Sequence, residues 1–276
     1  LRKGLAITAI SLFLIFCSVV GAATGVIVAF QDDLPSLAPL EDYTSSKWSL
    51  PTKIYSRDGQ LISSLYEERR EIVKVNQLPP ELIQAVIAIE DTRFFAHNGI
   101  DFTGIARAAV KNVMAGRIVE GGSTLTQQLA KVLFLSPRQT FRRKIKEALL
   151  ALKIERNYTK KEILGRYFNK IYFGEGAYGV ETAAQIYFGK SAKNLNTAES
   201  ALLAALPKAP SYYSPIDHSQ RARSRHRVVL NLMEREGMID EGQAEVLHES
   251  FWEDYAQSLH DREQKKQRNI REAAYF

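Results

Sequence analysis

Two adjacent carboxylates, Glu90 and Asp91, stand where an apolar helix is expected to end. Acids at a helix C-terminus oppose the helix dipole, which favours cations there, so helix stability does not explain them. Phe94 and Phe95 follow directly, and apolar surroundings raise the pKa of a carboxyl group. The pair is therefore a candidate for acid–base chemistry. The alternative is an exposed loop in which the acids pair with Arg93.

A glycine pair opens a second polar stretch, GGSTLTQQLAK, over residues 121–131. Its Thr124, Gln128 and Lys131 recur at positions i, i+4 and i+7 and therefore share one helix face. Glycine lets a ligand approach the backbone closely, and a helix N-terminus favours an anion. A solvated face is typically rich in Glu and Lys, whereas here no carboxylate follows until Glu147. The pattern predicts a ligand-binding face, with a solvated polar face as the alternative.

Cations crowd the start of a third stretch, RRKIKEALLALKIE, over residues 142–155. Arg143 and Glu147 lie one helical turn apart, and such a surface ion pair contributes only about 0.3–0.5 kcal/mol. One carboxylate does not require so many cations. The surplus, which includes Lys144, favours a polyanion such as a pyrophosphate. A basic patch facing lipid headgroups and a set of plain surface ion pairs are the alternatives.

The composition narrows the classes of protein and of site. The 276 residues carry a net charge of +6, a basic excess that suits an anionic partner. The single cysteine, Cys17, excludes an intrachain disulfide, and the 5 histidines are scattered. Because no HExxH, CxxC or GxxxxGK[ST] pattern occurs, neither a zinc site built by the protein nor a P-loop is expected.

The N-terminal region predicts a membrane anchor. From Leu5 to Phe30 no charged residue occurs, and a helix of that length can cross a bilayer. Arg2 and Lys3 precede the run and acids follow it, which places the rest of the chain outside the cytoplasm. We therefore expect a cytoplasmic stub and a single transmembrane helix over residues 1–31. A cleaved signal peptide is the alternative.

Beyond this region the chain is predicted to be mainly α-helical with one small β element. Thr52–Leu65 alternates around an Asp-Gly pair, as a β-hairpin does, and Glu71–Val75 is predicted to add a short strand. After residue 80 the pattern is helical throughout. Capping boxes and one apolar stripe mark successive helices: Thr124 with Gln127, Thr159 with Glu162, Asn196 with Glu199, and the stripe of Phe141, Ile145, Leu149 and Leu152.

Taken together, these stretches resemble a known family. EDTRFFAHNG, GGSTLTQQLAK and RKIKEALLALKIE are similar to three successive motifs of the peptidoglycan glycosyltransferase domain of class A penicillin-binding proteins. Two further motifs, KEILGRYFNKIYFGEGAYGVETAAQIYFGK and LLAALPKAPSYYSP, follow in the family's order. The resemblance covers Ile54 to Glu236, most of the chain that follows the predicted anchor.

The resemblance implies a fold, a reaction and a set of residues. The fold is mainly α, lysozyme-like and bilobal, and the reaction is the inverting polymerisation of lipid II into β-1,4-linked glycan strands with release of undecaprenyl pyrophosphate. Glu90 would be the catalytic base, and Glu147 a second essential glutamate near the leaving pyrophosphate. The implied substrate-binding residues are Asp91, Phe94, His97, Ser123, Thr124, Gln128, Lys131, Arg143 and Lys144.

The same resemblance sets the expected organisation and partners. Residues 32–51 would be a linker, 52–250 the glycosyltransferase domain, and 251–276 a linker toward a transpeptidase domain whose SxxK serine does not occur here. The expected partners are lipid II, the growing strand, membrane lipid and other cell-wall synthesis proteins, with no nucleic acid. No cofactor is required, although Glu147 is placed to attract Mg²⁺ or Mn²⁺ bridging the pyrophosphate.

Two other functions remain open from the sequence. A lysozyme-type cleaving enzyme also sets a glutamate at a helix end, but it needs no phosphate-binding cations. A non-catalytic, membrane-anchored scaffold would keep the fold as a docking surface. The catalytic domain is expected outside the cytoplasmic membrane in every case. Val113–Glu120 is expected to dip into the membrane or form a flap, with a plain connection between helices as the alternative.

Overall fold

The computed structural model describes residues 2–41, 52–55, 57, 61–65, 71–136, 138, 140–255 and 257. Within these residues the chain is mainly helical, and its only strands are β1 (Thr52–Tyr55) and β2 (Leu61–Leu65). The strands pair antiparallel with Thr52 opposite Leu65, which confirms the predicted hairpin. Its turn residues 58–60 lie outside the described part.

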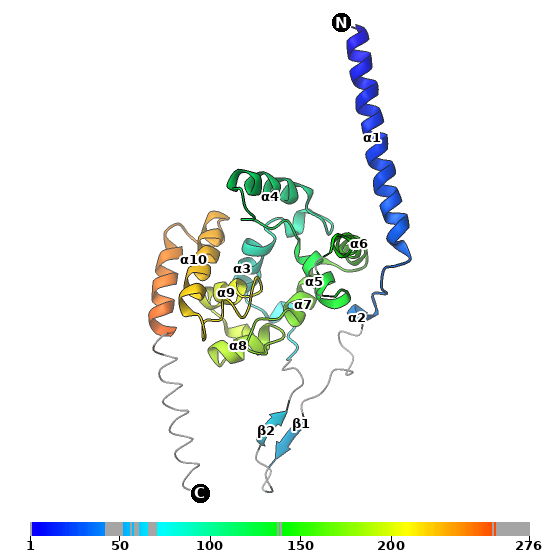
Figure 1. Cartoon of the computed structure of the whole chain (residues 1–276). Helices are drawn as coiled ribbons and strands as arrows, with labels where there is room; N and C mark the ends of the chain where they lie inside the picture. Colours follow the sequence, from blue (N-terminus) through cyan, green and yellow to red (C-terminus); the bar gives the residue numbers. More distant parts are fainter. Residues whose placement is uncertain are drawn as a thin grey trace.

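The helices form one body from which the hairpin and the N-terminal helix extend (Figure 1). Short 3-10 turns at η2 (Val75–Gln77), η3 (Phe94–Ala96) and η4 (Ala192–Asn194) connect them. A further helical segment covers residues 243–255. The helices are α1 (Arg2–Gln31), α2 (Ala38–Glu41), α3 (Pro80–Glu90), α4 (Phe102–Ala115), α5 (Leu125–Phe134), α6 (Phe141–Asn157), α7 (Lys160–Lys170), α8 (Val180–Phe188), α9 (Thr197–Ala205) and α10 (Ser219–Arg235).

The predicted capping boxes fix where three helices begin. At α5 the Thr124 hydroxyl accepts from the Gln127 amide N–H at 3.2 Å, and the Gln127 side chain accepts from the Thr124 N–H at 3.0 Å. Equivalent reciprocal pairs start α7 and α9. Each pair satisfies two N–H groups that would otherwise lack partners at a helix start. These local signals are confirmed.

The core holds the helix that carries Glu90. α3 packs against α9 and α10, and α5 packs against α6 and α7. Leu82 and Val86 of α3 are fully buried, in one cluster with Leu129 of α5 and Leu203 of α9. The C-terminal end of α3 is therefore held between two layers of helices.

Two predictions about local structure are wrong. The buried face of α6 carries Leu150, Ala151 and Ile154, whereas Phe141 of the predicted stripe is exposed. The face that turns inward is thus rotated away from the predicted one. Residues 71–74 form no strand. Instead, the side-chain amide of Asn169 in α7 accepts from the Val73 N–H at 2.9 Å and donates to the Val73 carbonyl at 2.8 Å, taking the place of a neighbouring strand.

The N-terminal segment after α1 is attached to the body. The Asp33 carboxylate pairs with Arg142 and Lys146 of α6, and the Leu40 carbonyl accepts from Arg166 of α7 at 3.2 Å. No helix in the described part of the chain has the combination of length and apolar character that a membrane crossing requires. The predicted anchor over residues 1–31 is therefore unconfirmed, and the lysozyme-like, two-lobed arrangement stays a prediction.

The predicted end of the domain at residue 250 needs correction. Phe251, Trp252 and Tyr255 are buried and pack with Phe188 of α8 in a second apolar cluster. Trp252 also donates from its indole N–H to Nδ1 of buried His226 at 3.0 Å. The packed body therefore continues to at least Tyr255, and the rest of the linker predicted over 251–276 lies almost wholly outside the described residues.

Candidate active site

Asp91 locks the end of α3 to the start of α5. Its carboxylate accepts from the Leu125 amide N–H at 2.9 Å and from Nε2 of His97 at 3.0 Å. The Gly99 N–H donates to Nδ1 of His97 at 3.2 Å, which places the ring proton on Nε2. A carboxylate at the first N–H groups of α5 also suits that helix dipole. The favourable interaction of the Asp91 charge with the dipole of α5 therefore offsets its unfavourable interaction with the dipole of α3.

Gly99 brings the same loop against α6. Its φ of +95° is a left-handed conformation that favours glycine, and a Cβ there would lie 2.8 Å from the Ala151 carbonyl oxygen. The Gly99 carbonyl accepts from the Thr124 hydroxyl at 2.6 Å. The loop from 91 to 99 is thus attached to both α5 and α6, and it fixes the residue that precedes it, Glu90.

Glu90 carries the carboxylate best placed for proton transfer. Burial raises the pKa of its carboxyl group above the usual value. A hydrogen bond from the Gln128 side chain at 2.7 Å opposes that rise, as do the positive charges of Arg225 and Lys208. An ionisable group kept in apolar surroundings, yet held by one amide donor and nearby cations, has the features of a general base.

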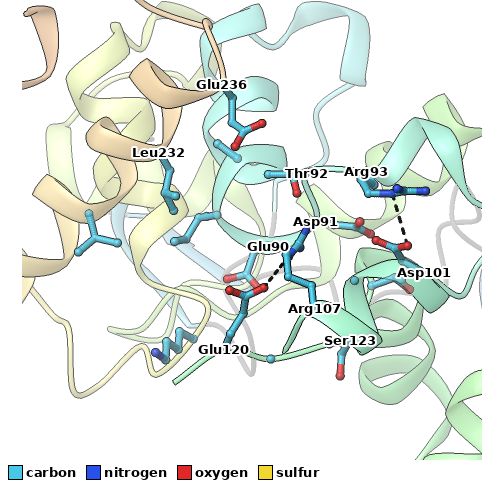
Figure 2. A pocket seen from close by; sticks show the side chains of 18 of the residues that line it. Glu90, Asp91, Thr92, Arg93, Asp101, Arg107, Glu120, Ser123, Leu232 and Glu236 are labelled. Carbon is cyan, nitrogen blue, oxygen red and sulfur yellow. Dashed lines mark hydrogen bonds and ion pairs between the residues drawn. The ribbon is translucent and has the colours of Figure 1, made fainter. Parts of the chain in front are cut away.

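The Glu90 carboxylate faces a cavity of about 600 Å³ between α3, α4 and α10. Figure 2 shows Glu90 beside Glu120, which pairs with Arg107 of α4, while Leu232 and Glu236 form another wall. The wall residues carry both signs of charge. Those that the sequence singled out and that line this cavity are Glu90, Asp91, Ser123, Thr124 and Gln128.

The predicted cations form a second group, joined to the cavity through Ser123. The Lys144 ammonium donates to the Ser123 hydroxyl at 2.7 Å and to Glu147 at 2.8 Å. Arg143 pairs with the other Glu147 oxygen, and its Nε is buried without a partner in the described part of the chain. Partial burial lowers the pKa of Lys144, and the charges of Arg143 and Lys131 lower it further. Glu147 supplies one negative charge to the three cations Arg143, Lys144 and Lys131, and the remaining positive charge suits an anionic ligand.

Glu147 does not fit a divalent cation. Its side chain is buried and each of its oxygens already binds a cation, one Arg143 and the other Lys144. Among the described residues, no three His, Cys, Asp or Glu side chains lie within reach of a common metal ion. Hard cations such as Mg²⁺ need free oxygen ligands. The donor set therefore supports Glu147 as the residue that holds the two cations in place.

The structure separates the predicted site residues into those that reach the cavity and those that support it. Phe94 is fully buried and His97 nearly so, which leaves no surface for the substrate contact predicted for them. Thr124 uses its hydroxyl within the protein, as donor to Gly99 and as the helix cap. Phe94 and His97 therefore support the site from outside the cavity lining, whereas Thr124 lines the cavity with its hydroxyl engaged within the protein. The neutral side chains that were predicted to bind a ligand form hydrogen bonds largely within the protein; Gln128, for example, donates to Glu90.

Sequence reasoning missed three residues that surround Glu90. Lys208 and Arg225 line the cavity, and burial lowers the pKa of each while the charge of Glu90 raises it. Tyr167 is fully buried, its hydroxyl has no hydrogen-bond partner among the described residues, and burial and the nearby carboxylates raise its pKa. Lys208 and Tyr167 stand inside quoted motifs, which was a usable signal. Arg225 lies in an Arg-rich helix, where nothing distinguishes it from its neighbours.

The C-terminal end of α4 and the segment that follows it present apolar side chains outward. Val113, Met114 and Ile118 are 81%, 83% and 88% exposed. The polar side of the same segment is tied down, because Asn112 accepts from the Val119 N–H at 2.7 Å and Lys111 pairs with Glu120. A fixed apolar projection of this kind is typical of an interaction surface, and the predicted membrane-dipping segment or flap stays a prediction.

Comparison with known proteins points in one direction. The transglycosylase family model matches residues 58–234. Penicillin-binding protein 1A of Neisseria gonorrhoeae is 46% identical over 252 residues, covering 89% of this chain and 31% of that protein. Penicillin-binding protein 1A of Aquifex aeolicus is 48% identical over 219 residues, covering 79% and 30% respectively. The chain thus spans less than a third of these relatives. A crystal structure of penicillin-binding protein 1A from Haemophilus influenzae matches 73% of this chain and 20% of that chain with 27% identity and a TM-score of 0.42.

Proposed function

Because the chain belongs to the transglycosylase family, we propose that it is a peptidoglycan glycosyltransferase that polymerises lipid II into β-1,4-linked glycan strands. One observation carries this proposal: the carboxylate of Glu90, with its raised pKa, faces a cavity of about 600 Å³. Through Ser123 that cavity adjoins a group of cations that Glu147 neutralises only in part. A base on one side and a site for a departing anion on the other are what glycosyl transfer from a pyrophosphate requires.

In the proposed reaction, Glu90 takes the proton from the 4-hydroxyl of the acceptor sugar. That oxygen attacks the anomeric carbon of the donor while the bond from this carbon to the pyrophosphate oxygen breaks, with inversion. A sugar hydroxyl is a poor nucleophile, and a positioned base contributes about 10²–10⁴-fold in rate. The Gln128 amide, 2.7 Å from the carboxylate, orients Glu90 toward the acceptor.

Arg143, Lys144 and Lys131 are proposed to hold the pyrophosphate. Negative charge on the leaving group grows as the bond breaks, so fixed cations stabilise the transition state more than the ground state. Glu147 holds two of these cations in place through its ion pairs. The described residues around Glu147 supply no set of metal ligands, so no step is assigned to Mg²⁺ or Mn²⁺.

A membrane location follows from a prenyl-linked substrate. We propose that the exposed apolar residues of α4 and its following segment, among them Val113, Met114 and Ile118, contact the bilayer. The charge-free sequence from Leu5 to Phe30 supports attachment there as well. The catalytic domain would then work on the extracytoplasmic, periplasmic side, with the growing strand and other cell-wall synthesis proteins as partners.

Replacement of the proposed base tests the function. Purified Glu90→Gln should lose polymerisation of lipid II by about 10²–10⁴-fold relative to the unchanged chain. Glu241→Gln, at an exposed glutamate after α10, is the matched control and should polymerise normally. If Glu90→Gln polymerised lipid II at the rate of the unchanged chain, Glu90 would not be the base.

The same preparation distinguishes the alternatives. A raised carboxyl pKa is also found in enzymes that cleave glycans, where the group acts as an acid. Incubation with isolated cell-wall sacculi would then release soluble fragments, whereas a glycosyltransferase leaves sacculi intact and lengthens strands from lipid II. No change with either substrate would support a non-catalytic scaffold.

A further inference from the structure

A buried network away from the cavity lining joins α5, α6 and α7. The Lys160 ammonium donates to the Glu155 carboxylate at 2.7 Å and to the His97 carbonyl oxygen at 2.6 Å. It also lies 4.3 Å from the centre of the Phe94 ring. The Thr126 hydroxyl donates to the same Glu155 oxygen at 2.6 Å. One ammonium group thus contacts two of the buried residues of the 91–99 loop, Phe94 and His97.

This arrangement is unfavourable for stability by itself. Lys160 is the first residue of α7, where the helix dipole disfavours a cation. Its side chain is 20% exposed and that of Glu155 only 4%, so both charges have lost most of their water. Apolar residues of similar volume are often as stable as such buried pairs. A role in positioning accounts for a charge at this place better than a role in stability does.

The contacts lead from Lys160 to the catalytic carboxylate. The carbonyl that Lys160 holds belongs to His97, whose ring donates to Asp91. Asp91 in turn accepts from the first amide of α5 and is adjacent in sequence to Glu90. α5 also carries Gln128, which donates to Glu90. Both attachments of Glu90, through the chain and through Gln128, therefore depend on how the loop sits against α5.

We propose that Lys160 is a positioning residue for Glu90, acting through the His97 carbonyl and the Phe94 ring. The inference rests on the proposed function, because it takes Glu90 as the base. Lys160 holds the loop from behind, so that Asp91 keeps its bonds to His97 and Leu125 and Gln128 stays within hydrogen-bond distance of Glu90. Lys160 is not among the residues that line the cavity.

The test uses a double substitution, Lys160→Met with Glu155→Gln. Methionine keeps the aliphatic length, and the glutamine avoids leaving a buried carboxylate without its cation while it still accepts from Thr126. Misplacing a catalytic group by about 1 Å costs as much as 10²-fold in rate, so kcat should fall by about 10–100-fold with KM for lipid II unchanged. The pKa of Glu90 should rise as its bond from Gln128 weakens, which moves the acid limb of the pH profile to higher pH.

Two further variants separate positioning from folding. Lys160→Arg keeps the charge and should therefore retain a large part of the kcat that the double variant loses. This result is expected even if the double variant is less stable than the unchanged chain. Lys161→Met removes the exposed neighbouring cation and should leave kcat and the pH profile unchanged. Loss of kcat only in proportion to the folded fraction, with an unmoved pH profile, would overturn the proposal.

A readout without catalysis separates this inference from the proposed function. Hydrogen exchange of the Leu125 amide, which Asp91 protects, should be faster in the double variant than in the unchanged chain. If the unchanged chain makes no glycan but this exchange still quickens, the function is wrong and the positioning stands. Equal exchange at Leu125 in the two proteins, with equal exchange at Gly99, would refute the positioning whatever the activity.

Discussion

Glu90→Gln should weaken catalysis and strengthen the fold at the same time. The substitution keeps the size of the side chain, and its amide oxygen still accepts from Gln128, which is 2.7 Å from the carboxylate. It loses the charge-assisted part of that bond, worth about 1 kcal/mol. The substitution also removes a buried charge, which stabilises the folded state. Because burial outweighs the bond and the nearby cations in raising the pKa of Glu90, the gain is the larger of the two.

The direction in which this difference in stability changes with pH follows from the raised pKa of Glu90. A carboxyl group whose pKa is higher in the folded than in the unfolded chain reduces stability above both pKa values and does not affect it below both. The unchanged chain should therefore be less stable than Glu90→Gln at about pH 7, by roughly 1 kcal/mol, as is common when a functional charge is removed. For a domain of this size that raises Tm by about 2–4 °C.

Thermal unfolding of both proteins at a series of pH values measures this difference. The gain in Tm should shrink as pH falls and vanish once Glu90 is protonated in both states. Glu241→Gln, at an exposed position, should show no gain at any pH. A variant that is less stable than the unchanged chain at neutral pH, or a gain that persists in acid, would refute the account of Glu90 as a buried, strained carboxylate.

Three other outcomes are expected. Arg225→Met should move the acid limb of kcat/KM to higher pH, because the Arg225 charge lowers the pKa of the catalytic carboxyl group; an unmoved limb would place that charge elsewhere. Glu147→Leu should lower the free energy of unfolding by about 3 kcal/mol, because it leaves Arg143 without its partner. Denaturant unfolding measures this loss, and Glu147→Gln, which can still accept a hydrogen bond, should show a smaller one. Ile118→Asp with Met114→Asp should reduce sedimentation with anionic lipid vesicles several-fold, whereas Ile118→Leu should not; equal binding by both would contradict the membrane contact.

Local sequence signals determined the helix starts. A capping box satisfies its hydrogen bonds within four residues, so Thr124 with Gln127 and Thr159 with Glu162 could be recognised without any tertiary information. The hairpin, set by short-range alternation around a turn, was equally readable. Glu90 and Asp91 were recognisable as a pair because acids at the end of an apolar helix conflict with the helix dipole, and the family resemblance indicated Glu90 as the base.

Contacts between distant residues decided the rest. The sequence predicted that Thr124 binds substrate, but only the packing of the 91–99 loop on α5 shows its hydroxyl donating to Gly99. The inward face of α6 was predicted wrongly because it includes Glu147, a charged residue that is buried in ion pairs with Arg143 and Lys144. The spacing of apolar residues along the helix does not reveal this. Residues 71–74 look like a strand, yet a side chain 96 residues away supplies the hydrogen bonds.

The sequence by itself determined which residues are able to do chemistry, because residue type and helical spacing are local properties. Only the tertiary structure decided which of them reach the cavity. It brought Arg225 and Lys208 from the last third of the chain to Glu90, and it withdrew Phe94 and His97 into the interior. Burial and electrostatic neighbourhood depend on the packing of whole helices, which spacing along one helix does not specify.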